Sequence, residues 1–409
     1  MRPSPASANT DAGTAATRGA PGRVAEVHVQ TRHGLLVAAG FVVAAVVVGI
    51  ARVGSGWWSP LHLFVVGGLL SAISAVTQML AVTWSAAPAP RALVAVAQRW
   101  TLAAGTIALV VGRETHRTWW FVVGGTAVVA AMLGLAGILL RVRRQAVTPR
   151  FSPAIESYVA AAVAGAAGMS IGILLGAGRA GQRAVELRDV HLVLNVFGLV
   201  GLVIAGTLPY FAATQVRSKM SPRATPAAMR ITFASLGIAA AVAATGHFVE
   251  RPGIVAAGLA TYVLGLVAIA TMLPVYARSR VRWAGPRVVQ LVAGVAWWAA
   301  MTVALADATI RETDDLAILQ ALVVGGFGQI LVASLAYLGP VLRGGGHRRL
   351  TAGFALTRSW ISLAAGNTAA LAALLGHGPT FAGALAIWLA DTAIRAGGLM
   401  LTARSSDDV

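Results

Sequence analysis

Long apolar runs, separated by short clusters of Arg, Pro and Gly, occupy most of this chain. A run of about 20 apolar residues is long enough to cross the hydrocarbon core of a bilayer as a helix. Backbone groups in lipid must be hydrogen-bonded within their own segment, and these Gly-rich runs lack the alternation of barrel strands. The pattern predicts an all-α polytopic membrane helix bundle of about twelve spans, near residues 34–54, 60–84, 93–112, 118–140, 154–176, 189–214, 229–249, 252–276, 285–306, 316–342, 354–375 and 379–402.

The two ends of the chain depart from this pattern. Residues 1–33 are rich in Ala, Ser, Thr, Pro and Arg and contain no apolar stretch typical of a signal peptide. We therefore expect a disordered cytoplasmic tail over 1–33, a single transmembrane domain over 34–402 and a short cytoplasmic tail over 403–409.

The composition agrees with a membrane protein. Hydrophobic residues make up 57% of the chain and charged residues 11%, and the mean hydropathy is +0.76, whereas soluble domains carry roughly 25% charged residues. The net charge of +18 would suggest nucleic acid for a soluble protein. Here the basic residues lie in loops between spans, so we interpret them as orientation signals and expect a lipid bilayer, not nucleic acid, as the partner.

Basic residues are more frequent in the loops after even-numbered spans than in the loops after odd-numbered spans. By the positive-inside rule, this asymmetry places both termini in the cytoplasm. Lys219 is the only lysine in a chain rich in Ala, Gly and Val, which indicates a GC-rich bacterial genome and hence the bacterial inner membrane. The basic residues of the even-numbered loops include Arg141, Arg143, Arg144, Arg150, Arg217, Lys219, Arg223, Arg278, Arg280, Arg282 and Arg287.

Histidines at the outer boundary are the strongest candidates for chemistry. The chain has no cysteine, which excludes Fe–S clusters, thiolate copper sites and covalent c-type haem. In the predicted orientation His62 opens the second span, His191 opens the sixth and His247 nearly closes the seventh, so all three have similar depth. Imidazoles from three helices are candidate ligands for copper or zinc. The alternative is that they hydrogen-bond within the wet headgroup region.

Other polar residues within the spans allow two interpretations each. Asn195 lies one turn after His191 and either orients that imidazole or forms a hydrogen bond between helices. Asp391 and Arg395, four residues apart in the last span, form either a structural ion pair or part of a proton or ion relay.

An internal repeat relates three of the spans. The second reads HLFVVGGLL from His62, the tenth reads QALVVGGFG from Gln320, and the sixth reads HLVLNVFGLVG from His191. The period of four helices predicts a pseudo-threefold arrangement of three four-helix units. The glycine pairs 67–68, 124–125 and 325–326 indicate close helix packing.

The chain resembles the catalytic subunit of haem-copper oxidases in having twelve spans, outer histidines on the second, sixth and seventh spans, and a four-helix repeat. The chain resembles more closely the NnrS-type membrane proteins and their actinobacterial relatives, through QALVVGGFGQILVASLAYLGPVLRGGGH from Gln320 to His347. The resemblance implies that His62, His191 and His247 bind copper or haem at the outer side. It also implies a role in redox, nitrosative or metal stress, with a periplasmic or extracellular redox partner.

The tenth span departs from the oxidase pattern. Gln320 stands where a haem-ligand histidine is expected, so the resemblance does not extend to a terminal oxidase. Two other classes of protein stay open: a secondary transporter, for which twelve helices with an internal repeat are a common format, and a degenerate, non-catalytic membrane scaffold. The chain contains no hydrolase or kinase motif, and whether it is an enzyme is left open.

Overall fold

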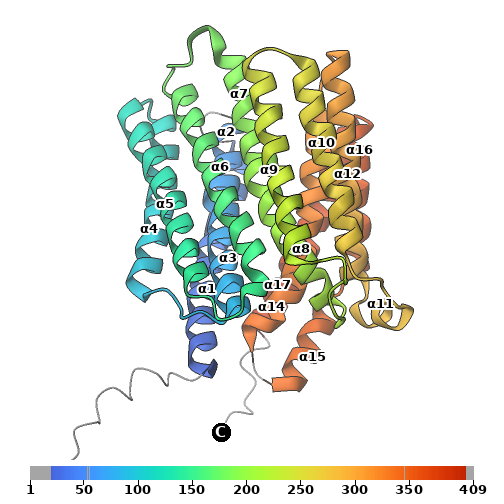
Figure 1. The fold of residues 1–409 in the computed structure, drawn as a ribbon. Helices are drawn as coiled ribbons and strands as arrows, with labels where there is room; N and C mark the ends of the chain where they lie inside the picture. The colour runs from blue at the N-terminus through green and yellow to red at the C-terminus, as the bar shows by residue number, and fades with distance from the viewer. Residues whose placement is uncertain (1–19, 53, 55, 345, 402–409) are drawn as a thin grey trace, which may run out of the picture.

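The structure, a computed structural model, describes residues 20–52, 54, 56–344 and 346–401. The described chain is helical throughout, and its long helices run side by side as one bundle (Figure 1). The helices are α1 (Ala20–Ala51), α2 (Trp58–His62), η1 (Leu63–Leu69), α3 (Leu70–Ser85), α4 (Ala92–Glu114), α5 (Thr118–Arg144), η2 (Pro149–Phe151), α6 (Ser152–Gly176), η3 (Gly181–Arg183), α7 (Ala184–Val193), η4 (Leu194–Gly201), α8 (Leu202–Gln215), α9 (Pro226–Phe248), α10 (Pro252–Met272), α11 (Arg278–Ala284), α12 (Pro286–Arg311), α13 (Leu316–Ala321), η5 (Leu322–Gly328), α14 (Gln329–Arg343), α15 (Gly346–Leu356), α16 (Trp360–Leu374) and α17 (Gly378–Leu401).

Eleven of the described helical segments are long and apolar enough to cross a membrane. Three of them are composite helices with a π-helical segment inside: α2, η1 and α3 join without a break, as do α7, η4 and α8, and α13, η5 and α14. These segments confirm a polytopic helical membrane protein. The first helix begins at Ala20, ahead of the expected start at residue 34. Residues 1–19 and 402–409, which hold most of the two expected tails, lie outside the described residues.

The same packing pattern occurs three times along the chain. In each group of four helices the first packs against the composite second: α1 against η1 and α3, α6 against η4 and α8, and α12 against η5 and α14. The third packs against the fourth, as α4 does with α5, α9 with α10 and α16 with α17. Neighbouring groups meet where α5 contacts α6 and where α10 contacts α12.

Each composite helix contains a π-helical segment near its N-terminal end. These segments, η1, η4 and η5, begin within three residues after His62, His191 and Gln320, so the repeat in sequence coincides with a repeat in backbone geometry. A π-segment widens the helix and leaves backbone groups that need new partners. Tyr262 supplies one such partner in η4, where its hydroxyl donates to the carbonyl of Phe197 at 3.0 Å.

The segment expected as a single span over 354–375 is divided into α15 and α16. Ser359 caps the second helix by accepting a hydrogen bond from the Ser362 amide at 2.9 Å, an arrangement that favours a helix start at this point. Arg395 Nη1 donates to the carbonyls of Leu356 and Arg358, each at 2.8 Å. The interruption is therefore stable because its free backbone groups have partners.

Glycines let the paired helices approach closely, as the glycine pairs predicted. A Cβ on Gly124 of α5 would lie 2.3 Å from the Leu109 amide nitrogen of α4, and one on Gly67 would lie 2.4 Å from the Phe41 ring. A Cβ on Gly325 would lie 2.7 Å from Ala370 Cβ. A side chain at any of these positions would push two helices apart.

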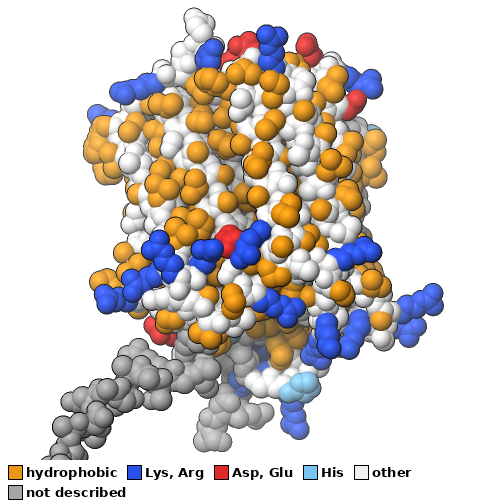
Figure 2. All heavy atoms as spheres, viewed as in Figure 1, with side chains coloured by type: hydrophobic (Ala, Val, Ile, Leu, Met, Phe, Trp, Pro, Cys, Tyr) orange, Lys and Arg blue, Asp and Glu red, His pale blue; other side chains and the backbone are white. Residues whose placement is uncertain are grey.

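Charged side chains gather at the two ends of the bundle, and apolar side chains predominate on the surface between them (Figure 2). Lys and Arg are more numerous at the end where α11 and α15 lie, and the first turn of α1 and the last turn of α17 lie at that end as well. The apolar band is the surface that a bilayer covers.

Candidate functional site

His62 lies at the end of α2, immediately before the first π-segment. Its Nδ1 donates to the carbonyl of Trp58 at 2.8 Å, and its ring stacks on the Trp58 indole with centroids 3.8 Å apart. The hydrogen bond and the stacked ring hold this half-buried imidazole in one orientation.

His191 occupies the equivalent place in the second group of helices. Its Nδ1 donates to the carbonyl of Gly168, on α6, at 2.7 Å. The imidazole fits only because Gly172 has no side chain, since a Cβ there would lie 2.7 Å from His191 Cε1. The neighbouring helix thus positions His191 through both a hydrogen bond and a matching gap.

Asn195 lies beside His191, as the spacing predicted. Its Nδ2 donates to the backbone carbonyl of His191 at 2.7 Å and lies 3.4 Å from Nδ1 of the same residue. Gly168 makes room for it, because a Cβ at that position would lie 2.5 Å from Asn195 Nδ2. Asn195 therefore fixes the backbone that carries His191, and the Gly168 carbonyl orients the ring.

The two hydrogen bonds determine the tautomer of both histidines. A carbonyl oxygen can only accept, so each neutral imidazole must carry its proton on Nδ1. The lone pair then lies on Nε2 of His62 and of His191. Metal-binding histidines commonly donate one ring N–H to a backbone carbonyl and coordinate through the other nitrogen, and both imidazoles are held in that state.

His62 and His191 are close enough for charge on one to act on the other, and Arg113 of α4 also acts on His62. The Arg113 guanidinium carbon lies 5.6 Å from the centroid of the Trp58 ring. A pocket of about 130 Å³ opens beside Arg113 and is lined by Gly112, Arg113, His116, Thr118, Phe121 and Gly176, and neither His62 nor His191 lines it. The His62 and His191 side chains of the second and sixth spans thus lie within electrostatic range of each other, and Arg113, which acts on His62, lines the pocket.

The third predicted ligand, His247, lies beside Asp189, which is on α7 two residues before His191. The His247 Nδ1 lies 3.9 Å from Asp189 Oδ2, and Asp189 also pairs with Arg188 at 3.0 Å. Asp315, just before α13, lies near enough to interact electrostatically with His247 and with Asp189. Desolvation by burial, and to a smaller extent the Asp189 charge, raises the pKa of Asp315. Over residues 20–401, leaving out 53, 55 and 345, no three His, Cys, Asp or Glu side chains gather as a metal site.

The remaining predicted polar residues are Gln320, Asp391 and Arg395. Gln320 is exposed on α13. Asp391 and Arg395 form a two-contact ion pair, at 2.9 and 3.0 Å, within α17. Arg395 also donates hydrogen bonds to carbonyls at the interruption between α15 and α16, so the ion pair stabilises this part of the fold.

Sequence reasoning missed the contribution of α6. Gly165, Gly168, Gly172 and Gly176 recur every three or four residues, and a Cβ on each would collide with Leu199, Asn195, His191 and Phe121 respectively. That spacing places all four on one helix face. The glycine stripe is a visible signal for a helix that faces large side chains.

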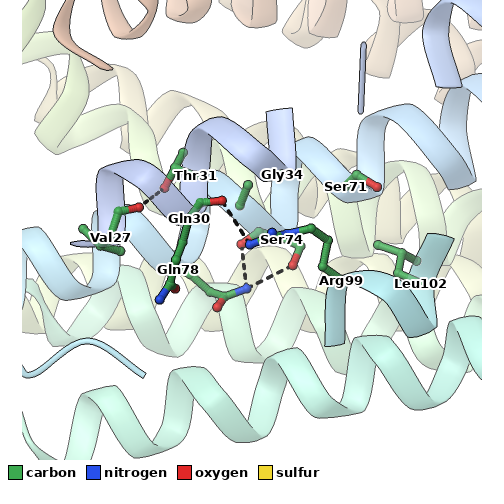
Figure 3. Close-up of a pocket in the computed structure, with 10 residues that line it drawn as sticks. Val27, Gln30, Thr31, Gly34, Ser71, Ser74, Gln78, Arg99 and Leu102 are labelled. Atoms are coloured by element: carbon green, nitrogen blue, oxygen red, sulfur yellow. Dashed lines mark hydrogen bonds between the residues drawn. The ribbon is translucent and has the colours of Figure 1, made fainter. Parts of the chain in front are cut away.

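A second polar group lies between α1, α3 and α4 (Figure 3). Arg99 donates to the Gln30 carbonyl at 3.0 Å, and Gln78 donates to the Ser74 carbonyl and hydroxyl, each at 3.1 Å. The cavity between them has a volume of about 20 Å³, enough for a single water molecule. Gln30 Nε2 and Ser71 Oγ have no other partner among the described residues, so a bridging water suits this cavity better than a transported solute.

Comparison with known proteins leaves the family open. No protein-family model matches this chain, and no curated protein is significantly similar to it. The resemblance to NnrS-type proteins and haem-copper oxidases therefore stays a prediction.

Proposed function

We propose that this protein binds one small metal ion, copper in preference to haem, through His62 and His191 at the outer end of the bundle. The observation that carries the proposal is the pair of Nδ1–carbonyl hydrogen bonds, which leave both Nε2 atoms available as ligands. The two histidines come from equivalent places in two successive groups of helices, as in a site built between repeats.

The size of the adjacent pocket favours an ion over haem. Cofactor-sized ligands occupy pockets of about 300–1,000 Å³, and the pocket that Arg113 lines measures about 130 Å³. The charge of Arg113 opposes a divalent ion more strongly than a monovalent one. Both considerations favour Cu(I), with the pocket supplying room for a water molecule or an anionic co-ligand.

We place this site on the periplasmic or extracellular side, with both termini in the cytoplasm, because the opposite end carries more basic residues. We also interpret the threefold recurrence of π-segments and helix pairs as a pseudo-threefold repeat, which supports the resemblance to the oxidase-like families. A redox role in copper or nitrosative stress follows from that resemblance, with an extracytoplasmic electron partner.

The transporter alternative gains less support. The helices run unbroken through Gly325 and Gly366, whereas transporters typically bind substrate at interrupted helices near the bilayer midplane. The polar cavity between α1, α3 and α4 is large enough for one water only.

A competitive Cu(I) titration of the purified protein tests the proposal. We expect His62→Ala and His191→Ala each to abolish the high-affinity site, because one imidazole cannot replace two. His247→Ala is the matched control, since this histidine has similar depth and contacts Asp189 instead. Equal affinities in all four proteins would contradict the proposal, and a haem absorbance band lost in His191→Ala would redirect it to haem.

A further inference from the structure

Arg287 is the most unusual charged residue of the fold. It lies in the first turn of α12 and is only 1% exposed, and none of its three guanidinium nitrogens has a hydrogen-bond partner within the part of the chain that the structure describes. Three aromatic rings surround it, with the guanidinium carbon 5.2 Å from Trp283, 5.3 Å from Tyr337 and 4.7 Å from Phe354. Ring faces attract the positive charge but leave its N–H donors unused.

Two further arginines lie next to it. The Arg217 guanidinium carbon is 4.0 Å from the centroid of Trp283, and Arg358 donates to the Trp283 carbonyl. Both act electrostatically on Arg287. Arg395, which donates to the Arg358 carbonyl, already holds the Asp391 carboxylate. The three positive charges around Trp283 repel each other, and a bound anion would reduce this repulsion.

Other unused donors lie in the same region. Arg358 Nε, the Tyr276 hydroxyl and the Ser218 hydroxyl are buried without a partner among the described residues. Tyr276 packs beside Trp283 against the small cluster of Val216, Ala284 and Val288. Burial raises the pKa of Tyr276 to about 12, so its hydroxyl keeps its proton and can donate. The unsatisfied groups are therefore donors suited to the oxygens of an oxyanion.

The position along the bundle matches a membrane surface. The short helix α11 stands out at the rim of the bundle (Figure 1), where basic side chains gather (Figure 2). Its Arg278, Arg280 and Arg282 are exposed. The N-terminus of α12 adds the positive end of a helix dipole. In the predicted orientation this region meets the cytoplasmic leaflet, whose anionic headgroups bind to basic pockets between helices.

We propose that Arg287, Arg217 and Arg358 bind a phosphate group at the cytoplasmic end of the bundle, carried by an anionic phospholipid or by free inorganic phosphate. Arg287 forms the buried floor of the site, and the exposed Arg217 forms its rim. The Trp283 ring holds these two guanidinium groups in place from one side. The site is independent of the histidine pair, which lies at the other end.

The test measures thermal unfolding of the full chain in neutral detergent. The additives are phosphatidylglycerol, phosphatidylcholine and inorganic phosphate, each added alone. We expect phosphatidylglycerol to raise the unfolding temperature, with a midpoint concentration about tenfold higher for Arg217→Gln, since one charge-assisted contact is lost. If inorganic phosphate alone gives the same variant-dependent shift, the ligand is the free anion; if only the lipid does, the ligand is the headgroup.

Arg280→Gln is the matched control, because it removes an exposed arginine of α11 at the same membrane level. It should behave like the wild type. Arg217 is exposed, so its replacement leaves the packed interior intact, and Arg287→Lys tests the buried position while keeping its charge. Equal midpoints in wild type and Arg217→Gln, or an equal loss in Arg280→Gln, would overturn the proposal in favour of diffuse surface attraction.

Discussion

Replacing Gly172 by alanine tests how α6 positions His191 without touching a ligand. The added Cβ would lie 2.7 Å from His191 Cε1, while carbon atoms pack at about 3.5 Å or more. The imidazole must then move by about 0.8 Å. If it moves away from α6, its 2.7 Å hydrogen bond to the Gly168 carbonyl lengthens to about 3.5 Å, the limit for such a bond.

The effect on stability should be small. Losing the hydrogen bond costs about 1 kcal/mol, and alanine in place of glycine within a helix returns about 1 kcal/mol. Metal affinity should fall, because removing the group that orients a histidine ligand typically costs about 10- to 100-fold. The Gly172→Ala variant is therefore expected to fold normally and to bind Cu(I) more weakly in a competitive titration.

Gly137→Ala on α5 is the matched control, because nothing lies within 4 Å of the position its Cβ would take. Its Cu(I) affinity should equal that of the wild type. Unchanged affinity in a normally folded Gly172→Ala variant would refute the view that the Gly168 carbonyl prepares His191 as a ligand.

Three further predictions concern stability. Gly124→Ala should lower the unfolding temperature relative to Gly137→Ala, since its Cβ would meet the α4 backbone at 2.3 Å and overpacking costs about 1–3 kcal/mol; equal melting curves would contradict this packing. Arg395→Ala should destabilise by about 3–5 kcal/mol by leaving a mostly buried carboxylate unpaired, whereas Arg311→Ala breaks an exposed pair with the same i,i+4 spacing and should change stability far less; similar losses in chemical denaturation would argue against the capping role. Burial and a neighbouring carboxylate raise the folded-state pKa of Asp315. The free energy of unfolding should therefore fall as pH rises through that pKa, and Asp315→Asn should remove this pH-dependent loss. A melting temperature with the same pH dependence in both proteins would contradict this prediction.

The apolar pattern was sufficient to predict most of the long helices, because span length is a property of local sequence. The repeat also predicted that His62 and His191 have equivalent places, and the π-segments that follow both residues agree with it. Depth alone, however, does not determine which side chains meet, even on neighbouring helices such as α7 and α9. His247 has a suitable depth, yet its helix places it beside Asp189.

The interruption between α15 and α16 was hidden for a related reason. The stretch 354–375 is apolar enough to suggest one helix, and the break depends on Arg395, which is distant in sequence and provides donors for the free carbonyls. Arg287 likewise counted only as a basic loop residue. Its burial against three aromatic rings arises from the packing of α11, α14 and α15 around the start of α12, which no local pattern reveals.

The copper content of the protein purified from cells tests the central claim most directly. Elemental mass spectrometry on the wild type, His191→Ala and His247→Ala would report copper, iron and zinc together. We predict near-stoichiometric copper in the wild type and in His247→Ala, and copper at background in His191→Ala. Copper at background in all three proteins, or copper that His191→Ala retains, would contradict a metal site formed by His62 and His191.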